Sequence, residues 1–161
     1  MNLLMLNQLN NFFFNQMKKL SKVRKVLSKI PDINHGGCGI ATLTMYRWLK
    51  ENNLLDEDTK IIFLYNDDEG RYARNQRAVQ KECPQDLTVP THCALYYKGR
   101  IIDSERKISD TDYYHQQIIS NSVYLERIIE KANEWNHAFD RKFVSKIAMR
   151  TGVELSDIKT S

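Results

Sequence analysis

The hydrophobic residues near the start of the chain recur every three or four positions, which is the spacing of an α-helix. Such a stripe predicts one long helix, or two shorter ones, over residues 2–30. Pro31 ends this pattern, because proline has no amide hydrogen with which to continue a helix. The stripe consists of Leu6, Leu9, Phe13, Met17, Leu20, Val23, Leu27 and Ile30.

The pattern changes several times between residues 39 and 103. Residues 39–50 again have helical spacing, and residues 71–82 are compatible with a short helix. The apolar run at 61–65 is short and has polar residues on both sides, which predicts a buried strand. Residues 92–98 and 100–103 predict a β-hairpin around a tight Lys98-Gly99 turn.

From about Ile118 onward the chain returns to helical spacing and predicts two C-terminal helices. The first would contain Ile119, Val123, Ile128, Ile129, Ala132 and Trp135; the second would contain Phe139, Phe143, Val144, Ile147 and Ala148, with Gly152 as its stop. We therefore expect one α+β domain. It would have an N-terminal helical arm (1–33), a core (34–111) and C-terminal helices (112–161).

Composition and charge narrow the class of protein. The chain has 161 residues, 42% hydrophobic and 27% charged, so it can bury a core and is not expected to be disordered. Its net charge of +4 permits an acidic partner without requiring one. No segment has the roughly 20 apolar residues of a membrane-spanning helix, and no signal peptide is evident.

The three cysteines are too few for a disulfide framework, which favours a reducing, cytoplasmic location. The abundance of Asn, Lys and Tyr would also suit a bacteriophage protein, placed in the virion or in the host cytoplasm.

A candidate nucleophile stands at the start of the second predicted helix. Cys38 follows Gly36 and Gly37, and the positive end of the helix dipole would stabilise its thiolate. The free N–H groups of a helix start can also hold the oxyanion of a tetrahedral intermediate. The Cys38 amide is one candidate donor, and the side chains of Asn34 and His35 are two others.

The predicted hairpin supplies a base and a residue to orient it. If Lys98 and Gly99 form the loop, paired residues sum to 197, so His92 and Asp103 are diagonal neighbours on one face. An Nδ1–H to carboxylate hydrogen bond is then within reach. In the same register Glu105 lies directly opposite His92 and is the alternative orienting residue. Cys38, His92 and Asp103 would act as nucleophile, base and orienter.

Zinc is the main chemical alternative, because His35, Cys38, Cys83, His92 and Cys93 are all suitable ligand types. Their spacing lacks a Cys-x2-Cys pair, and the adjacent His92 and Cys93 should point to opposite faces of a strand. We interpret Cys83 and Cys93 as structural. The sequence also lacks a phosphate-binding glycine loop, so no metal and no organic cofactor is expected.

Segment 34–104 resembles the papain-like cysteine hydrolase superfamily, especially its transglutaminase-like and bacteriocin-processing-peptidase-like branches. Gly37-Cys38-Gly39-Ile40-Ala41 is similar to the nucleophile helix, and the segment from His92 to Asp103 is similar to the His–Asp hairpin. The resemblance implies a nucleophile helix packed on a small antiparallel sheet. It also implies a Cys38, His92 and Asp103 triad. Asn34 and His35 stand where papain-type peptidases have a glutamine.

Three functions follow from these patterns. The first is a thiol hydrolase or acyltransferase acting on amide bonds of a peptide or protein. The second is a non-catalytic interaction module, such as a phage structural protein, that binds a protein partner through its terminal helices. The third is nucleic-acid binding through the basic side of the first helix, although such a row of lysines is common on solvated helices and we do not expect nucleic acid as the partner. The same basic side would also suit lipid.

Overall fold

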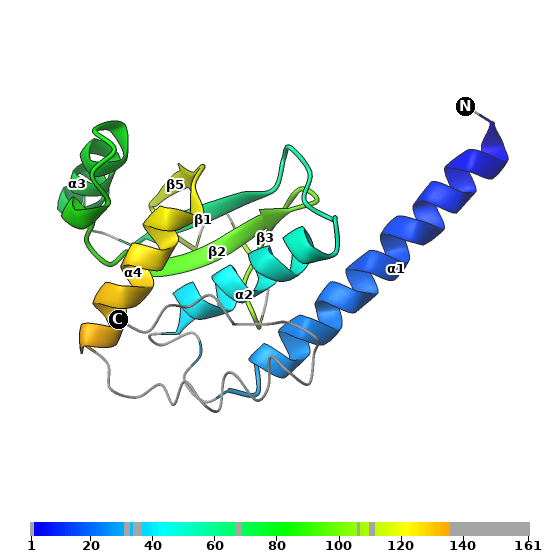
Figure 1. Cartoon of the computed structure of the whole chain (residues 1–161), viewed down its shortest axis with the longest axis horizontal. Helices are drawn as coiled ribbons and strands as arrows, with labels where there is room; N and C mark the ends of the chain where they lie inside the picture. The colour runs from blue at the N-terminus through cyan, green and yellow to red at the C-terminus, as the bar shows by residue number, and fades with distance from the viewer. Residues whose placement is uncertain are drawn as a thin grey trace.

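An antiparallel sheet of five strands forms the centre of the fold, which is seen here in a computed structural model (Figure 1). The structure describes residues 2–30, 33, 37–66, 69–105, 107–109 and 112–135. Within them the helices are α1 (Leu3–Leu27), α2 (Cys38–Glu51), α3 (Glu69–Gln80) and α4 (Ser122–Trp135), with a 3-10 turn at Pro84–Asp86. The strands are β1 (Lys60–Tyr65), β2 (His92–Tyr97), β3 (Arg100–Ile102), β4 (Lys107–Ile108) and β5 (His115–Ile119). The α+β class is therefore confirmed.

Most of the elements predicted from periodicity are present. The first helix, the helix beginning at Cys38, the apolar strand, the short helix near residues 71–82 and the hairpin correspond to α1, α2, β1, α3 and β2–β3. The helical pattern that includes Val123 and Ile128 corresponds to α4. The second predicted C-terminal helix, at residues 139–148, lies outside the described residues.

The prediction was wrong at Ile118 and Ile119, which belong to strand β5 rather than to a helix. In β5 only Gln117 and Ile119 are buried, so the strand has one face toward the solvent and one face toward the core. Its sequence, His-Gln-Gln-Ile-Ile, carries little of this alternation, because the buried Gln117 is polar. These residues form a strand because every residue of β5 pairs with one of β1, from Ile61↔Ile119 to Tyr65↔His115.

The helices cover one face of the sheet and leave the other to a smaller cluster. The main core joins residues of α1, α2, α3 and α4 to strand residues such as Phe63 and Leu95. On the opposite face, Ile62, Leu64, Ala94, Ile101 and Ile108 form a second buried cluster. A strand presents alternate residues to its two faces, so both sides of β1 and β2 are apolar, as in a strand buried on both faces.

A chain crossing covers part of that second face. The strand order is β4-β3-β2-β1-β5, so consecutive β4 and β5 lie at opposite edges of the sheet. The connection must therefore span four inter-strand spacings, about 19 Å. Its described residues 112–114, here called the crossing segment, place Tyr113 against the second cluster, and the Tyr114 amide donates to the Tyr65 carbonyl at 2.9 Å.

Candidate active site

Cys38 is the first residue of α2, as the sequence predicts. The residue before it, Gly37, has no side chain with which to cap the helix, and the first backbone bond of the helix runs from the Ala41 amide to the Gly37 carbonyl at 3.0 Å. The amide of Cys38 therefore points out of the helix end, where the positive pole of the helix dipole lies. Cys38 forms no disulfide, and the residue as a whole is partly buried.

The hairpin brings His92 and Asp103 together. Its register is the predicted one, with Tyr97↔Arg100 and Leu95↔Ile102 as partners. His92 Nε2 lies 3.0 Å from Asp103 Oδ2, and both side chains are 6% exposed. The nitrogen differs from our expectation: the bond uses Nε2, which leaves Nδ1 as the ring nitrogen available to Cys38.

Asp103 is held by two further hydrogen bonds from the backbone and from α1. The Glu105 amide donates to Asp103 Oδ1 at 2.7 Å, and Arg24 Nε donates to the Asp103 carbonyl at 2.7 Å. Glu105 itself is exposed and is not the orienting residue, because its amide rather than its carboxylate meets this site. Asp103 is thus fixed from both ends, which keeps the His92 ring in one orientation.

The side chains of Cys93 and His92 both interact with the Cys38 thiol. The hydrogen bond from the Cys93 side chain is the largest influence and lowers the pKa of Cys38. Burial raises it, but the hydrogen bond and positive charge of His92 and the Cys93 amide lower it further. The net pKa of Cys38 lies well below that of an ordinary cysteine. A lowered pKa favours the thiolate form of Cys38.

His92 changes in the opposite direction. Burial of the ring lowers its pKa, but the hydrogen bonds and charges of Asp103 and Cys38 outweigh burial and raise the pKa of His92 to about 9. A lowered thiol pKa beside a raised imidazole pKa describes a thiolate–imidazolium pair. The ring of Tyr113 lies parallel to that of His92, at 6.0 Å between centroids and 4° between planes, an offset-stacked arrangement.

Cys93, which we interpreted as structural, is buried in the main core and also interacts with Cys38. It is buried, and its bond to Cys38 raises its own pKa well above the ordinary value, so it stays protonated and donates its S–H. Cys93 faces the helix-covered side of the sheet, where α2 begins. His92 is the first residue of β2, so it lies at the end of the sheet and also meets Cys38. His92 and Cys93 thus lie on opposite faces of β2, and both side chains still reach the Cys38 sulfur.

Three residues of this site, Cys93, Arg24 and Tyr113, could not be assigned to it from the sequence. Each of them reaches the site from a different element, so only the tertiary arrangement reveals them. The predicted oxyanion donors Asn34 and His35 lie outside the described residues. The Cys38 amide remains the donor that the structure describes.

The described residues form no metal-binding cluster at this site, and the large groove of the protein lies elsewhere. Among the described residues, no group of three or more His, Cys, Asp or Glu side chains is arranged to hold a metal ion. A groove of about 770 Å³ lies on the second face of the sheet, lined by residues such as Ile62, Tyr96 and Arg100. None of the three triad residues lines it, so we do not assign it to the chemistry of Cys38.

No protein-family model, no curated protein and no solved structure matches the chain. The residues of the site are therefore the basis for inferring its chemistry.

Proposed function

We propose that this protein is a cysteine hydrolase or acyltransferase that cleaves an amide bond through a Cys38–His92–Asp103 triad. One observation carries the proposal: Cys38 at the start of α2 interacts with His92, whose Nε2 lies 3.0 Å from Oδ2 of the buried Asp103 carboxylate. Acyl transfer needs a nucleophile in contact with a base, and a third group that orients the base. The resemblance of segment 34–104 to papain-like hydrolases supports the same reaction.

The reaction begins from the thiolate–imidazolium pair. Cys38 Sγ attacks the carbonyl carbon of the substrate, and the Cys38 amide donates to the oxygen that becomes negative. The tetrahedral intermediate collapses when the C–N bond breaks and His92 gives its proton to the leaving nitrogen. The product is a thioester on Cys38 and a free amine.

The second half of the reaction releases the acyl group. The now neutral His92 takes a proton from water or from an acceptor amine, which attacks the thioester carbonyl. Collapse expels the Cys38 thiolate and restores the imidazolium. Water gives hydrolysis and an amine gives transfer, so the same triad serves either outcome. Asp103 holds the ring and stabilises its positive charge throughout.

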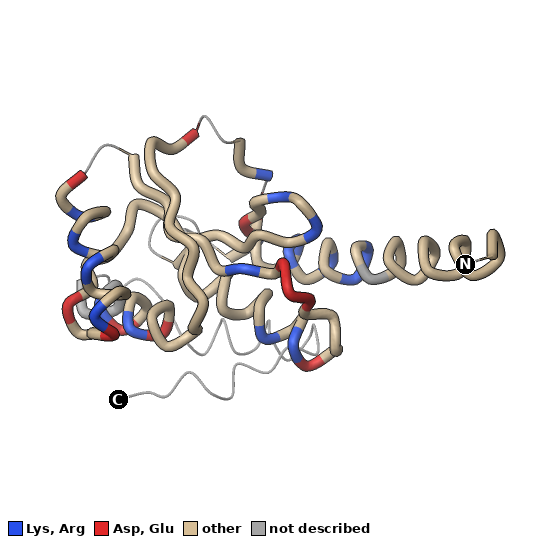
Figure 2. Tube along the Cα trace, turned by 90° about the horizontal axis from the view of Figure 1, so that it is seen from above, with Lys and Arg blue, Asp and Glu red and all other residues tan. Residues whose placement is uncertain are grey.

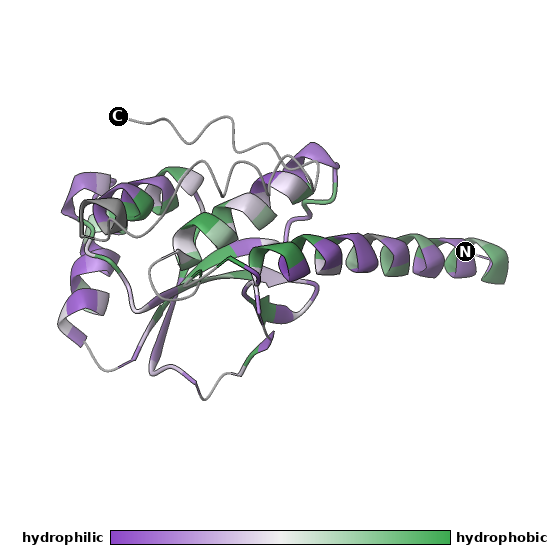
Figure 3. Ribbon diagram, turned by 90° about the horizontal axis from the view of Figure 1, so that it is seen from below, coloured by the Kyte–Doolittle hydropathy of each residue, from purple (hydrophilic) through white to green (hydrophobic). Residues whose placement is uncertain are grey.

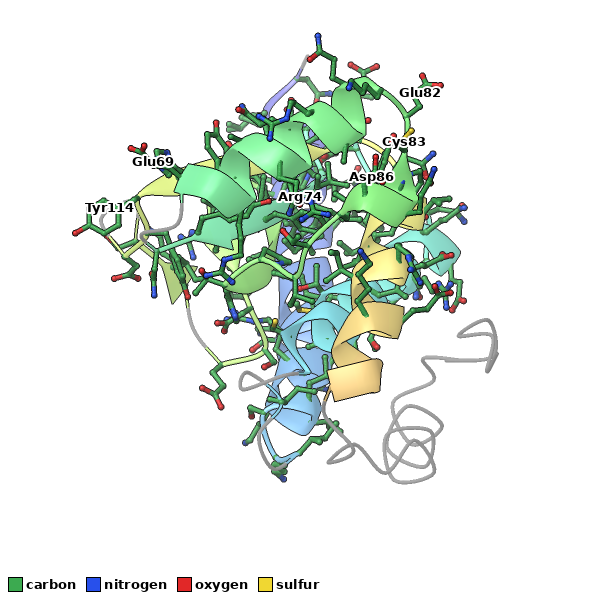
Figure 4. All side chains as sticks on the ribbon, turned by 90° about the vertical axis from the view of Figure 1, so that its left-hand side faces the viewer. Glu69, Arg74, Glu82, Cys83, Asp86 and Tyr114 are labelled. Atoms are coloured by element: carbon green, nitrogen blue, oxygen red, sulfur yellow. The ribbon has the colours of Figure 1, made fainter. Side chains whose placement is uncertain are left out.

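Thiol labelling tests the proposal without a known substrate. At mildly acidic pH, iodoacetamide should modify Cys38 at least about tenfold faster than Cys83, because alkylation follows the thiolate fraction. Cys83 is a matched internal control: it is also partly buried, and it lies in the turn after α3, next to Glu82 (Figure 4). Mass spectrometry of the peptides measures both rates in one sample.

Variants of the base and the orienting residue complete this experiment. His92→Ala should remove most of the difference in rate between the two thiols, and Asp103→Asn should reduce it. Cys83→Ser should leave the labelling of Cys38 unchanged. Equal rates for Cys38 and Cys83 in the wild-type protein, with no effect of His92→Ala, would contradict the triad and leave a non-catalytic interaction module as the better description.

A further inference from the structure

The first half of α1 extends beyond the body of the protein and is apolar (Figure 1). Farther along the helix, Leu20, Val23 and Leu27 are at most 4% exposed and belong to the main core. Residues 3–14, here called the outer arm, lie outside this core, and the body meets them at Phe13, whose ring centre is 4.7 Å from Lys98 Nζ. Their large side chains are 41% to 75% exposed: Leu3, Leu4, Met5, Leu6, Leu9, Phe12, Phe13 and Phe14. An exposed apolar surface of this size marks a binding surface.

The outer arm carries apolar side chains on two sides, and on the second side they alternate with the amides of Asn7 and Asn11. At 100° per residue, Met5, Leu6, Leu9, Phe12 and Phe13 continue the stripe that packs into the core farther along α1. Leu3, Leu4 and Phe14 lie on the opposite side, in line with the lysine row that follows. Figure 3 shows hydrophobic and hydrophilic stretches alternating along this part of α1. A second copy of the arm, paired along the stripe, would leave these three side chains in water. An apolar medium that surrounds the arm would cover both sides.

A row of lysines begins where the arm ends. Residues 3–17 contain no charged side chain, whereas Lys18, Lys19, Lys22 and Lys25 follow within two turns and are all exposed (Figure 2). No acidic residue precedes Asp32, so nothing in this part of the sequence neutralises the row. Lys18 Nζ lies 4.5 Å from the centre of the Phe14 ring, which places the first positive charge directly against the apolar arm.

We propose that the outer arm binds the surface of an anionic lipid bilayer. Its leucines and phenylalanines would enter the boundary between headgroups and acyl chains, and the lysine row would contact the lipid phosphates. No described helix is apolar over a sufficient length to cross a membrane, so the arm lies at the surface and does not span the bilayer. This surface is separate from the triad, and the proposal does not depend on catalysis.

Vesicle flotation with the full chain tests the proposal. The protein should float with vesicles of phosphatidylcholine mixed with phosphatidylglycerol and should bind vesicles of phosphatidylcholine alone much more weakly. High salt should reduce binding to the mixed vesicles, because it screens the lysine–phosphate attraction. Lys18→Glu with Lys22→Glu should weaken binding about tenfold or more. A matched control is Lys50→Glu with Lys81→Glu, which makes the same charge change on exposed lysines of other elements and should bind as the wild type does.

Two pairs of apolar variants separate lipid from a second copy of the chain. Leu4→Gln with Phe14→Gln changes the lysine side, and Leu6→Gln with Leu9→Gln changes the stripe; both should reduce flotation. Neither pair should unfold the protein, because all four side chains are exposed, and circular dichroism checks this. The proposal is overturned by equal binding to both kinds of vesicle or by no binding. It is also overturned by a lipid-free dimer that only the stripe variants dissociate.

Discussion

We expect Cys93 to influence the reactivity of Cys38 through its S–H group. Its side-chain hydrogen bond is the largest influence that lowers the pKa of Cys38. Cys93→Ala removes the S–H donor, so the pKa of Cys38 should rise and the pH profile of its alkylation should move to higher pH. Cys93→Ser keeps a donor at the same position and should restore most of the low-pH reactivity. Initial labelling rates over a pH series measure the shift.

This comparison also separates a hydrogen-bond effect from a packing effect. Cys93 is buried, so both substitutions disturb the same site in the core to a similar extent. A profile that moves equally for alanine and serine would mean that packing, and not the donor, controls the thiol. A profile that moves for neither would mean that His92 and the helix end lower the pKa of Cys38 without help from Cys93.

At the residue scale, local chemistry determines what the sequence can predict. The pairing of His92 with Asp103 was predictable, because a two-residue turn sets the register of both strands. Lys98 and Gly99 have φ values of 49° and 76°, as the central residues of such a turn require. Cys93 was not predictable in the same way. Its role depends on where α2 begins relative to β2, and no local pattern encodes that placement.

At the scale of elements, Gly39 determines how closely α4 packs on α2. A Cβ atom at Gly39 would lie 3.0 Å from Ile129 Cγ1 and 3.7 Å from Leu125 Cδ1. The missing side chain of Gly39 makes room for α4, which packs beside α2 in the main core.

Gly39→Ala should therefore destabilise the protein, although alanine is the better helix former. Helix propensity favours alanine by at most about 1 kcal/mol, whereas overpacking costs about 1–3 kcal/mol. Urea denaturation should show a net loss of about 1–2 kcal/mol. In an Ile129→Ala background, which removes the clashing atom, Gly39→Ala should cost nothing or stabilise the protein. An equal loss in both backgrounds would contradict the packing explanation.

At the scale of the whole molecule, the connection between β4 and β5 links the two edges of the sheet, and its crossing segment lies against the face that no described helix covers. Tyr113 is its anchor: the ring packs against the cluster of Ile62, Leu64 and Ala94 and lies parallel to His92. Neither β4 nor β5 was predicted from the sequence, and the strand order cannot be read from local pattern. The crossing segment therefore follows from topology, and it connects the stability of the second face to the position of the base.

Tyr113→Ala should lower the free energy of unfolding by about 1–2 kcal/mol, because it exposes part of the second cluster and removes a half-buried ring. Tyr113→Phe keeps the ring and should keep most of the stability. Urea denaturation measures both variants, and the labelling rate of Cys38 should change with Tyr113→Ala but not with Tyr113→Phe, because only alanine removes the surface against which His92 lies. If alanine lowers stability and leaves the labelling of Cys38 unchanged, Tyr113 supports the sheet face alone and the hydrogen bond to Asp103 suffices to hold the imidazole.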